Sequence, residues 1–378
     1  MRCISLNIVL FILLTGSGFG QDSLWVGGQL SGFAGYAPED PLEGIAGGRY
    51  LPEMNYALKF QNNHQLDLDI GANLYGNAQV HPFDTSHSNG GINLYRLWAR
   101  YTGKQFEIRA GLQKINFGSA TLLRPLQWFD DIDPTDPLQF SNGVYGILGR
   151  VYFLNNANIW LWILAGNKNP RGFELIPNNP DIPEFGGRLQ LPVQKGEVAV
   201  TYHHRTADSR EAPGIPACEK IPENKYAVDA KWDIGIGLWF EASWIQKSRN
   251  IGALTNQSML TAGADYTMGV GNGLNIGAEH LFMSTDSTAF AFDNNLHVSA
   301  FMLTYPLGLF DRVSGYLFYL WQNDGTLSFM INYQHSFSRF SLFVMPYYTP
   351  KMEQNLFTHR YNQSLTGPGI RVMAVFNH

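Results

Sequence analysis

Residues 50–75 read YLPEMNYALKFQNNHQLDLDIGANLY, and this stretch decides the fold. Apolar side chains recur at every second position over residues 50–60 and again over residues 66–74, with Gln61 to His64 between them. A period of two is that of a β-strand, whose successive side chains point to opposite faces. The segment therefore predicts a β-hairpin with one apolar face.

The composition indicates a barrel that spans a membrane. Only 15% of the 378 residues are charged, against about 25% in an average soluble domain, while 14% are aromatic and 39 are glycine. A net charge of −5 speaks against a basic nucleic-acid binder. Beyond the N-terminus, no apolar run reaches the roughly 18 residues that a transmembrane helix needs. Transmembrane β-barrels combine few charges with a middling mean hydropathy, here −0.15, because lipid-facing and lumen-facing residues alternate.

The first 20 residues have the features of a secretory signal peptide. Arg2 supplies the positive charge, residues 7–14 the apolar segment, and residues 18–20 (GFG) a small-x-small cleavage site. We expect the mature chain, residues 21–378, to be one domain in the outer membrane of a Gram-negative cell. Cys218 is its only cysteine, so neither an intrachain disulfide nor a zinc ligand set is expected.

The alternation continues to the C-terminus and predicts an all-β fold, a transmembrane antiparallel β-barrel of about 18 strands, with 16 as the alternative. Each strand approaches the roughly 9–11 residues that a tilted strand needs to cross a bilayer. Short turns alternate with longer connections, which is typical of outer-membrane barrels with short periplasmic turns and long outer loops. The longer connections are expected at 37–48, 77–91, 114–142, 167–184 and 207–223.

The polar faces of the strands are expected to line a water-filled lumen. Five arginines on nearby strands would form a basic wall of the pore: Arg96, Arg100, Arg109, Arg150 and Arg188. A tight turn at 102–104 would set Arg100 opposite Glu107 and Trp98 opposite Arg109, and the preceding hairpin would set Lys59 opposite Asp67. The sequence assigns no partner to Arg96, Arg150 or Arg188.

The longest connection, residues 114–142, is expected to act as a constriction loop. At about 29 residues it exceeds the usual length of a structureless connection, and such loops tend to be functional. Its carboxylates would face the basic wall across the pore and filter solutes by size and dipole. The candidate residues are Arg124, Trp128, Asp130, Asp131, Asp133 and Asp136.

Two other interpretations of this loop stay open. One is a surface loop with solvated acids, in which the lumenal arginines only neutralise neighbouring carboxylates. The other is a calcium site, because Asp131, Asp133 and Asp136 offer hard oxygen ligands, although their spacing does not match the EF-hand loop.

Residues 87–90, HSNG, raise an enzymatic alternative. They are similar to the His-x-Ser-Asn-Gly signature of the outer-membrane phospholipase family, in which one residue separates the histidine from the serine. That spacing lets both side chains point the same way from a strand. Here His87 and Ser88 are adjacent, and on an extended strand they would point to opposite faces. The main expectation is therefore a protein that is not an enzyme.

The segment from Ile108 to Gly118, IRAGLQKINFG, and the Pro125–Pro137 stretch after it resemble a hairpin of porin-like outer-membrane proteins of the alginate-export type. Those proteins often read Ala-Gly-Arg-Gln, then an apolar residue and Trp-Gly, before an Asn/Asp-Pro-rich loop. Leu112 replaces the arginine here, and Phe117 replaces the tryptophan. The resemblance implies a β-barrel channel for small or oligomeric polar solutes and does not imply alginate itself.

Together these observations predict an outer-membrane channel for passive diffusion, with no catalytic residue, metal or cofactor. The expected partners are outer-membrane lipid, small polar solutes and the barrel-assembly machinery; no nucleic acid is expected, and a homo-oligomer stays open. The alternatives are a phospholipase-like barrel enzyme and a plugged barrel with a structural or assembly role.

Overall fold

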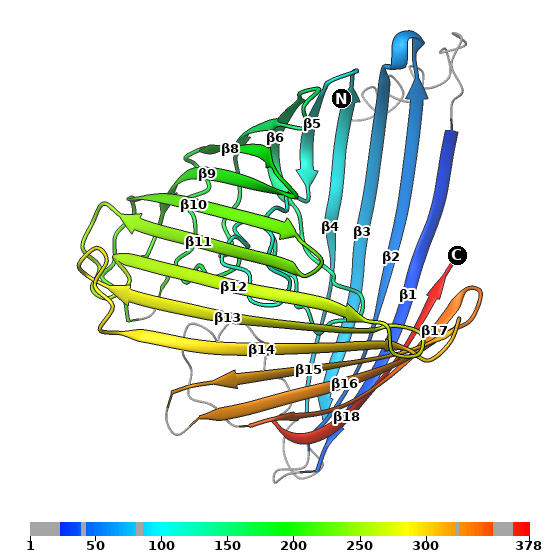
Figure 1. Ribbon diagram of the computed structural model, residues 1–378. Coiled ribbons are helices and arrows are strands. Elements are labelled where there is room, and N and C mark those ends of the chain that lie inside the picture. Colours follow the sequence, from blue (N-terminus) through cyan, green and yellow to red (C-terminus); the bar gives the residue numbers. More distant parts are fainter. Residues whose placement is uncertain (1–22, 39–42, 81–85, 213, 323–324, 351–365) are drawn as a thin grey trace.

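The computed structural model describes residues 23–38, 43–80, 86–212, 214–322, 325–350 and 366–378. These residues form eighteen antiparallel strands in one closed barrel, which confirms the fold class and the strand number (Figure 1). Consecutive strands are neighbours in the sheet, and β1 pairs with both β2 and β18. The expected signal peptide, residues 1–20, lies outside the described residues.

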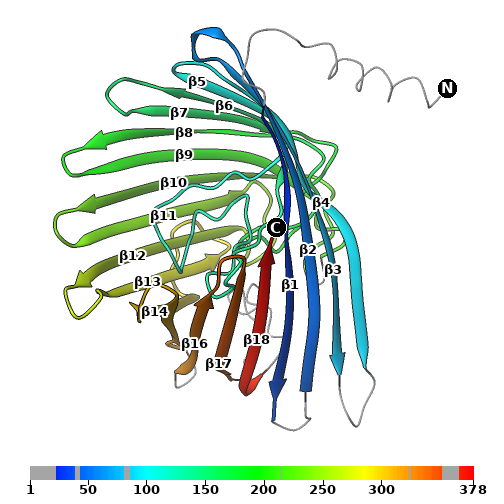
Figure 2. The same cartoon turned by 90° about the vertical axis from the view of Figure 1, so that its right-hand side faces the viewer.

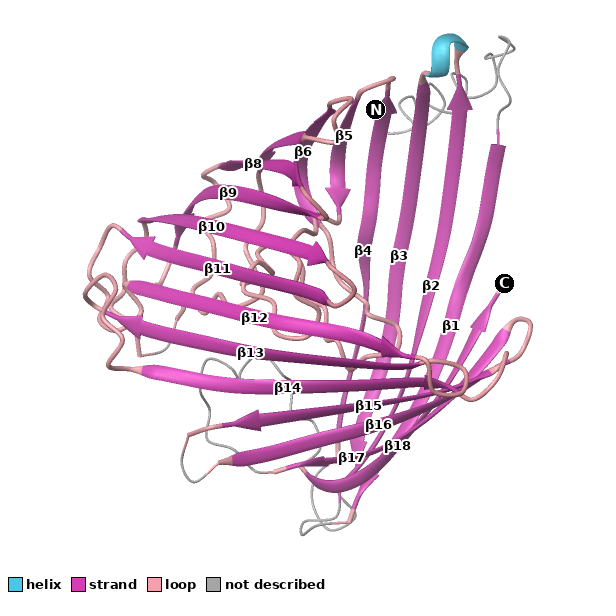
Figure 3. Cartoon of the chain, viewed as in Figure 1, coloured by secondary structure: helices cyan, strands magenta, loops and turns pink. Residues whose placement is uncertain are grey.

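Strands dominate the described chain, as Figure 3 shows. One 3-10 turn, η1 (Gln61–Asn63), joins two of them. Among the described residues no helix is long and apolar enough to cross a membrane. The strands are β1 (Ser23–Ala37), β2 (Glu43–Lys59), β3 (Gln65–Val80), β4 (His87–Thr102), β5 (Phe106–Gln113), β6 (Val144–Tyr152), β7 (Asn158–Leu164), β8 (Glu184–Val193), β9 (Gly196–Ala207), β10 (Ile221–Asp233), β11 (Gly237–Lys247), β12 (Asn256–Met268), β13 (Leu274–Asp286), β14 (Asn295–Pro306), β15 (Asp311–Leu320), β16 (Thr326–Ser336), β17 (Phe340–Thr349) and β18 (Gly367–Asn377).

The outward face of the barrel is largely apolar. Val26 of β1 and Leu161 of β7 are 67% and 63% exposed, and Phe301 of β14 is also exposed. In a closed barrel each strand pairs with two neighbours, so the backbone needs no water inside a bilayer. A closed barrel with an apolar exterior is typical of outer-membrane proteins. The chain is therefore located in the outer membrane.

The two ends of the barrel differ. The start of β1, the end of β18 and the short turns lie at one end, and the longer connections lie at the other. In outer-membrane barrels the short turns face the periplasm and the long loops face outward. We therefore call the end with the longer connections the outer end.

Strands β1 to β4 are longer than expected, with 15 to 17 residues each. Residues 43–48, 77–80 and 87–91 extend these strands, so the expected loops at 37–48 and 77–91 were too long. Glycine, alanine and asparagine are frequent in the extensions and leave no clear alternation to detect. By contrast β5, β6 and β7 have only 8, 9 and 7 residues. The barrel wall formed by these three strands is therefore shorter than β4 along the strand direction.

The expected pairing across the β4–β5 hairpin was wrong by two residues. Thr102 stays in β4, so the turn starts one residue later, and Glu107 lies opposite Thr102. Arg100 therefore faces Arg109, while Trp98 faces a glycine. The Trp98 ring lies against both guanidinium groups, with its centroid 5.4 Å and 4.8 Å from their central carbons.

The pairing expected between Lys59 and Asp67 was also wrong. The η1 turn places Lys59 opposite Gln65, and Asp67 lies opposite Ala57. Asp67 instead accepts hydrogen bonds from Arg100 on the next strand, at 2.9 and 3.0 Å.

Candidate functional site

Residues 114–142, which we call the inner loop, are held against the far wall of the barrel by Glu279 of β13. The Glu279 carboxylate accepts the backbone N–H groups of Thr121, Leu122 and Leu123 at 2.6, 3.0 and 2.6 Å. It also accepts the indole N–H of Trp239 at 3.0 Å. A buried charge that receives four hydrogen bonds makes a strong anchor.

Glu241 of β11 is a second anchor. Its carboxylate accepts the N–H groups of Ala120 at 2.7 Å and of Leu126 at 3.2 Å. Gly118 lies directly against this carboxylate with φ +104°, a backbone conformation that favours glycine. A side chain at that position would meet a Glu241 oxygen.

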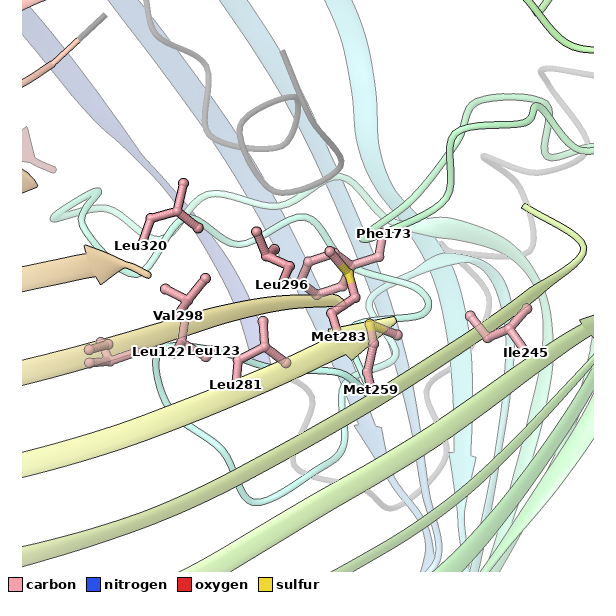
Figure 4. Packing of buried hydrophobic residues seen from close by; sticks show 11 residues of the cluster. Leu122, Leu123, Phe173, Ile245, Met259, Leu281, Met283, Leu296, Val298 and Leu320 are labelled. Carbon is pink, nitrogen blue, oxygen red and sulfur yellow. The ribbon is translucent and has the colours of Figure 1, made fainter. Parts of the chain in front are cut away.

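Apolar contacts reinforce the two anchors. Leu122 and Leu123 pack among inward side chains of β11 to β15, including Leu281 and Val298 (Figure 4). At its other end the inner loop contacts the opposite wall, where the Phe140 ring lies 5.4 Å from the Tyr95 ring of β4. A loop that contacts both walls must cross the lumen.

Phe117 lies at the centre of an aromatic cluster between the inner loop and β7. Its ring contacts Trp128 and Phe129 of the same loop and Trp160 and Trp162 of β7, with centroid separations of 5.8 to 6.3 Å. Trp128 is therefore buried in the packing rather than exposed to the passage.

Residues 165–183, which we call the companion loop, also fold inward. Gly172 (φ +53°) lies directly against the backbone oxygen of Gln127 in the inner loop, and Phe173 joins the cluster around Leu122 (Figure 4). The two loops thus pack on each other within the half of the lumen bounded by β6 to β14.

A buried network of charges fixes the companion loop to the wall. Glu174 pairs with Lys225, and with Arg205 at 3.1 Å, while Arg171 pairs with Glu184 at 2.5 Å. Burial alone would raise the pKa of the Glu174 carboxyl, but Arg205 and Lys225 hold it below the ordinary value. Removing one charged member would leave the buried network with an unbalanced charge, which is costly inside the protein.

The five arginines expected to form a basic wall each lie beside a wall carboxylate. The pairs are Arg96 with Glu53 (3.8 Å), Arg100 with Asp67 (2.9 Å), Arg109 and Arg150 with Glu107 (3.6 and 3.1 Å), and Arg188 with Asp229 (2.5 Å). The expectation that no partner could be assigned to three of them was therefore incomplete. Two of the partners lie two strands away, where hairpin pairing does not reach.

The acidic residues of the inner loop and these five arginines form no ion pair within the described chain. Asp130 pairs with Arg124 of its own loop at 3.3 Å. Asp133 and Asp136 accept backbone N–H groups of Thr135 and Leu138 at 2.8 and 3.0 Å. Asp131 also lies in this loop, with its N–H bonded to the Ser141 hydroxyl at 3.3 Å. Among the described residues, no group of three or more His, Cys, Asp or Glu is arranged to hold a metal ion, so the calcium alternative lacks a ligand set.

A lumenal cavity of about 790 Å³ remains between the inner loop and β1–β4 and β15–β18. Asp133 and Asp136 border it from the loop, and Arg49 of β2 and Arg371 of β18 border it from the wall. Burial raises the pKa of the Asp136 carboxyl.

Arg49 and Arg371 differ from the other lumenal arginines. Within the described part of the chain neither forms an ion pair, whereas each of the five arginines of the basic wall has one. The Arg49 guanidinium lies 4.3 Å from the centre of the Phe140 ring, and that of Arg371 lies 6.0 Å from the Phe33 ring. They are the positively charged side chains that border the cavity, and the Asp133 and Asp136 carboxylates border it from the loop.

The sequence alone did not single out Glu241, Glu279, Arg49 or Arg371. One available signal was that Glu279 lies at an inward position between a glycine and an alanine on the neighbouring strands, with no cation opposite. A buried carboxylate with no cation on the neighbouring strands needs hydrogen-bond donors from elsewhere, and a loop inside the barrel can supply them.

The residues of the enzymatic alternative do not form a pair. His87 and Ser88 are consecutive residues of β4 and point to opposite faces of the strand. No hydrogen bond between their side chains is present among the described residues.

Known protein families and curated sequences give no match to this chain. Solved structures do. The anion-selective porin of Comamonas acidovorans matches with TM-score 0.52 and 10% identity over 95% of this chain and 100% of its own. OccK7 (OpdD) of Pseudomonas aeruginosa matches with TM-score 0.56 and 11% identity over 94% and 99%. The fold is that of the outer-membrane porins.

A third neighbour has a different role. Wzi of Escherichia coli, a carbohydrate-binding β-barrel of the outer membrane involved in group 1 capsule assembly, matches with TM-score 0.53 and 11% identity. The match covers 92% of this chain and 84% of Wzi. The porin-type barrel is thus shared by proteins with different functions, and the lumen must distinguish them.

Proposed function

We propose that this protein is a porin-like channel through which small polar solutes diffuse passively past the inner loop. The observation that carries the proposal is the anchoring of that loop across the lumen by Glu241 and Glu279, beside a cavity of about 790 Å³. An anchored loop narrows a pore without closing it, which is how a wide barrel becomes selective. No step of this mechanism breaks or forms a covalent bond.

The route we propose runs along β1–β4 and β15–β18, because the inner and companion loops fill the other half of the lumen. Arg49 and Arg371 would act from the wall, and Asp133 and Asp136 from the loop. Opposed charges across a narrow passage favour solutes whose dipole aligns with the field. The five compensated arginines would support the wall electrostatically rather than select solutes.

The residues that line the cavity are suited to polar, sugar-like solutes. It combines Arg49, Asp136 and Asn77 with the rings of Phe33 and Tyr75. Charged and amide groups bind hydroxyl and carboxylate groups, while aromatic rings contact the apolar faces of sugar-like solutes. The resemblance to alginate-export-type porins extends the proposal to oligomeric polar solutes.

A plugged barrel with a structural or assembly role is the second candidate. The buried charges around Glu174 favour it, because they fix the companion loop firmly inside the barrel. The barrel enzyme is not favoured, since His87 and Ser88 do not meet.

Conductance in planar bilayers tests the proposal. We expect stepwise conductance from the wild-type protein, and larger steps when residues 119–139 are replaced by a short glycine-serine linker. A matched control shortens the 287–294 connection, where Phe290 packs on the outward face against Trp244, 4.7 Å between ring centroids. Conductance only after the deletion would identify a plugged barrel. A folded protein that never conducts, with or without the deletion, would remove the channel proposal.

A further inference from the structure

The outer half of β4 has a free edge. β4 pairs with β3 along its length, but it pairs with β5 only from Leu97 to Thr102. On the β5 side of His87–Leu94, no backbone hydrogen bond to another described segment is present. The cause is that β5 ends at Gln113, where the chain turns into the lumen. Figure 2 shows this half of β4 at the margin of the sheet, with β3 on one side and no strand on the other.

This segment, which we call the β4 edge (His87–Leu94), is exposed on both faces. Seven of its eight residues are exposed, and Ile92 reaches 73%. Natural edge strands are protected by charged residues, proline or a covering segment. From Ser88 to Leu94 the sequence SNGGINL contains no charge and no proline. The edge is therefore open to strand addition.

From this arrangement, we infer that the β4 edge docks an extended segment of a different polypeptide, which adds to the sheet as one more strand. A free edge presents N–H and C=O groups at the spacing of a β ladder, and an extended backbone is the ligand that matches it. The exposed side chains of Ile92 and Leu94 offer apolar contacts on one face, and Asn89 and Asn93 offer amides on the other. The matching segment alternates apolar and polar residues.

A second copy of this chain does not fit the same edge. A two-fold axis that relates two copies in one membrane runs along the membrane normal, and barrel strands are tilted by about 35–45° from it. Two β4 strands related by this axis cross at a wide angle and cannot form a ladder. We therefore take a different protein as the partner.

The position of the edge indicates the side from which the partner comes. β4 has 16 residues, whereas a tilted strand crosses the bilayer with about 9–11. Counted from Thr102 at the periplasmic end of β4, that span ends between Leu94 and Ile92, so His87–Gly91 of the β4 edge extend beyond the bilayer at the outer end. We expect a partner that approaches from outside the cell.

Hydrogen exchange tests the inference with a defined probe, the blocked heptapeptide acetyl-TVTVTVT-amide. In detergent-solubilised protein, at a peptide concentration ten times the dissociation constant, amides on the free side of the β4 edge should exchange about tenfold more slowly. Only alternate amides should respond, because the others already bond to β3. A peptide N-methylated at every second residue on the pairing side is the matched control and should give no protection.

A charged substitution on the edge provides a second, independent test. Ile92→Lys places a charge on the edge and should abolish the protection, while Val80→Lys on the neighbouring strand should keep it. Slow exchange of the edge amides in the free protein would show that the edge is already covered. That result would overturn the inference, as would equal protection by the N-methylated peptide or no protection up to the solubility of the probe.

Discussion

Replacing Glu279 with glutamine should release the inner loop while the barrel stays folded. Each carboxylate oxygen accepts two donors: one binds Thr121 N–H and Trp239 Nε1–H, and the other binds the N–H groups of Leu122 and Leu123. Glutamine keeps one acceptor oxygen and turns its NH2 group toward the other two donors. Trp239 belongs to the wall, so one or two of the bonds that hold the loop are lost, depending on which way the amide turns. At about 1.5–3 kcal/mol for each, the anchor weakens by roughly 1.5–6 kcal/mol. That change raises the released population of the loop by a factor of about 10 to 10⁴.

Two measurements report on this release. Single-channel recordings should show larger and less steady conductance for Glu279→Gln than for the wild type. Thiol labelling of an Ala120→Cys variant, made in a Cys218→Ser background, should be faster when Glu279→Gln is added, because Ala120 is only 6% exposed while the loop is anchored. Glu197→Gln is the matched control, because Glu197 bonds to Gln190 at the periplasmic end of β9, away from the loop.

The reasoning would be refuted by a folded Glu279→Gln barrel with wild-type conductance and wild-type labelling at residue 120. Heat-modifiable migration on a gel shows whether the barrel is folded. A Glu279→Gln protein that fails to fold would show instead that the carboxylate is needed by the wall, and labelling of Glu241→Gln would then test the anchor.

Three further outcomes are expected. Arg49→Ala should shift the reversal potential in a salt gradient toward cations, and Arg49→Lys, which keeps the charge, should leave it near the wild-type value. Because burial raises the pKa of Asp136, its carboxyl takes up a proton at a higher pH than an exposed aspartate does. The preference of the channel for cations should therefore fall as the pH is lowered from neutral to mildly acidic. Asp136→Asn should remove this part of the pH dependence of the reversal potential. Gly118→Ala forces a side chain against Glu241 at a positive φ, so it should weaken loop anchoring by about 1–3 kcal/mol, measured as faster thiol labelling of the loop. Gly149→Ala, where an added Cβ meets nothing within 4 Å, is its control.

The fold was largely predictable from the sequence because a strand repeats every two residues. The alternation over residues 50–75 and its continuation predict all eighteen strands. It does not predict where a strand ends when small residues take over, as in the extensions of β2 to β4. It also leaves the register of the β4–β5 hairpin undetermined. The alternation of side chains along β4 is the same whether Thr102 is the last residue of the strand or the first residue of the turn.

The site was less predictable, because its contacts join residues that are distant in the chain. The partner of Arg188 is Asp229, two strands away, and the position of that pair depends on how the barrel closes. The anchor at Glu279 lies 156 to 158 positions from the N–H groups it accepts. Inward arginines are visible in the sequence, but whether each is compensated is decided only by the folded lumen.

The two anchors accept hydrogen bonds from main-chain groups of the inner loop and not from its side chains. Glu241 and Glu279 accept N–H groups, which every residue except proline supplies whatever its identity. Mutations of the loop residues that border the cavity can therefore accumulate without detaching the loop, provided that the backbone keeps its path. Solute preference and barrel assembly are then encoded in separate sets of positions, so the channel can acquire a new preference without having to evolve a new wall.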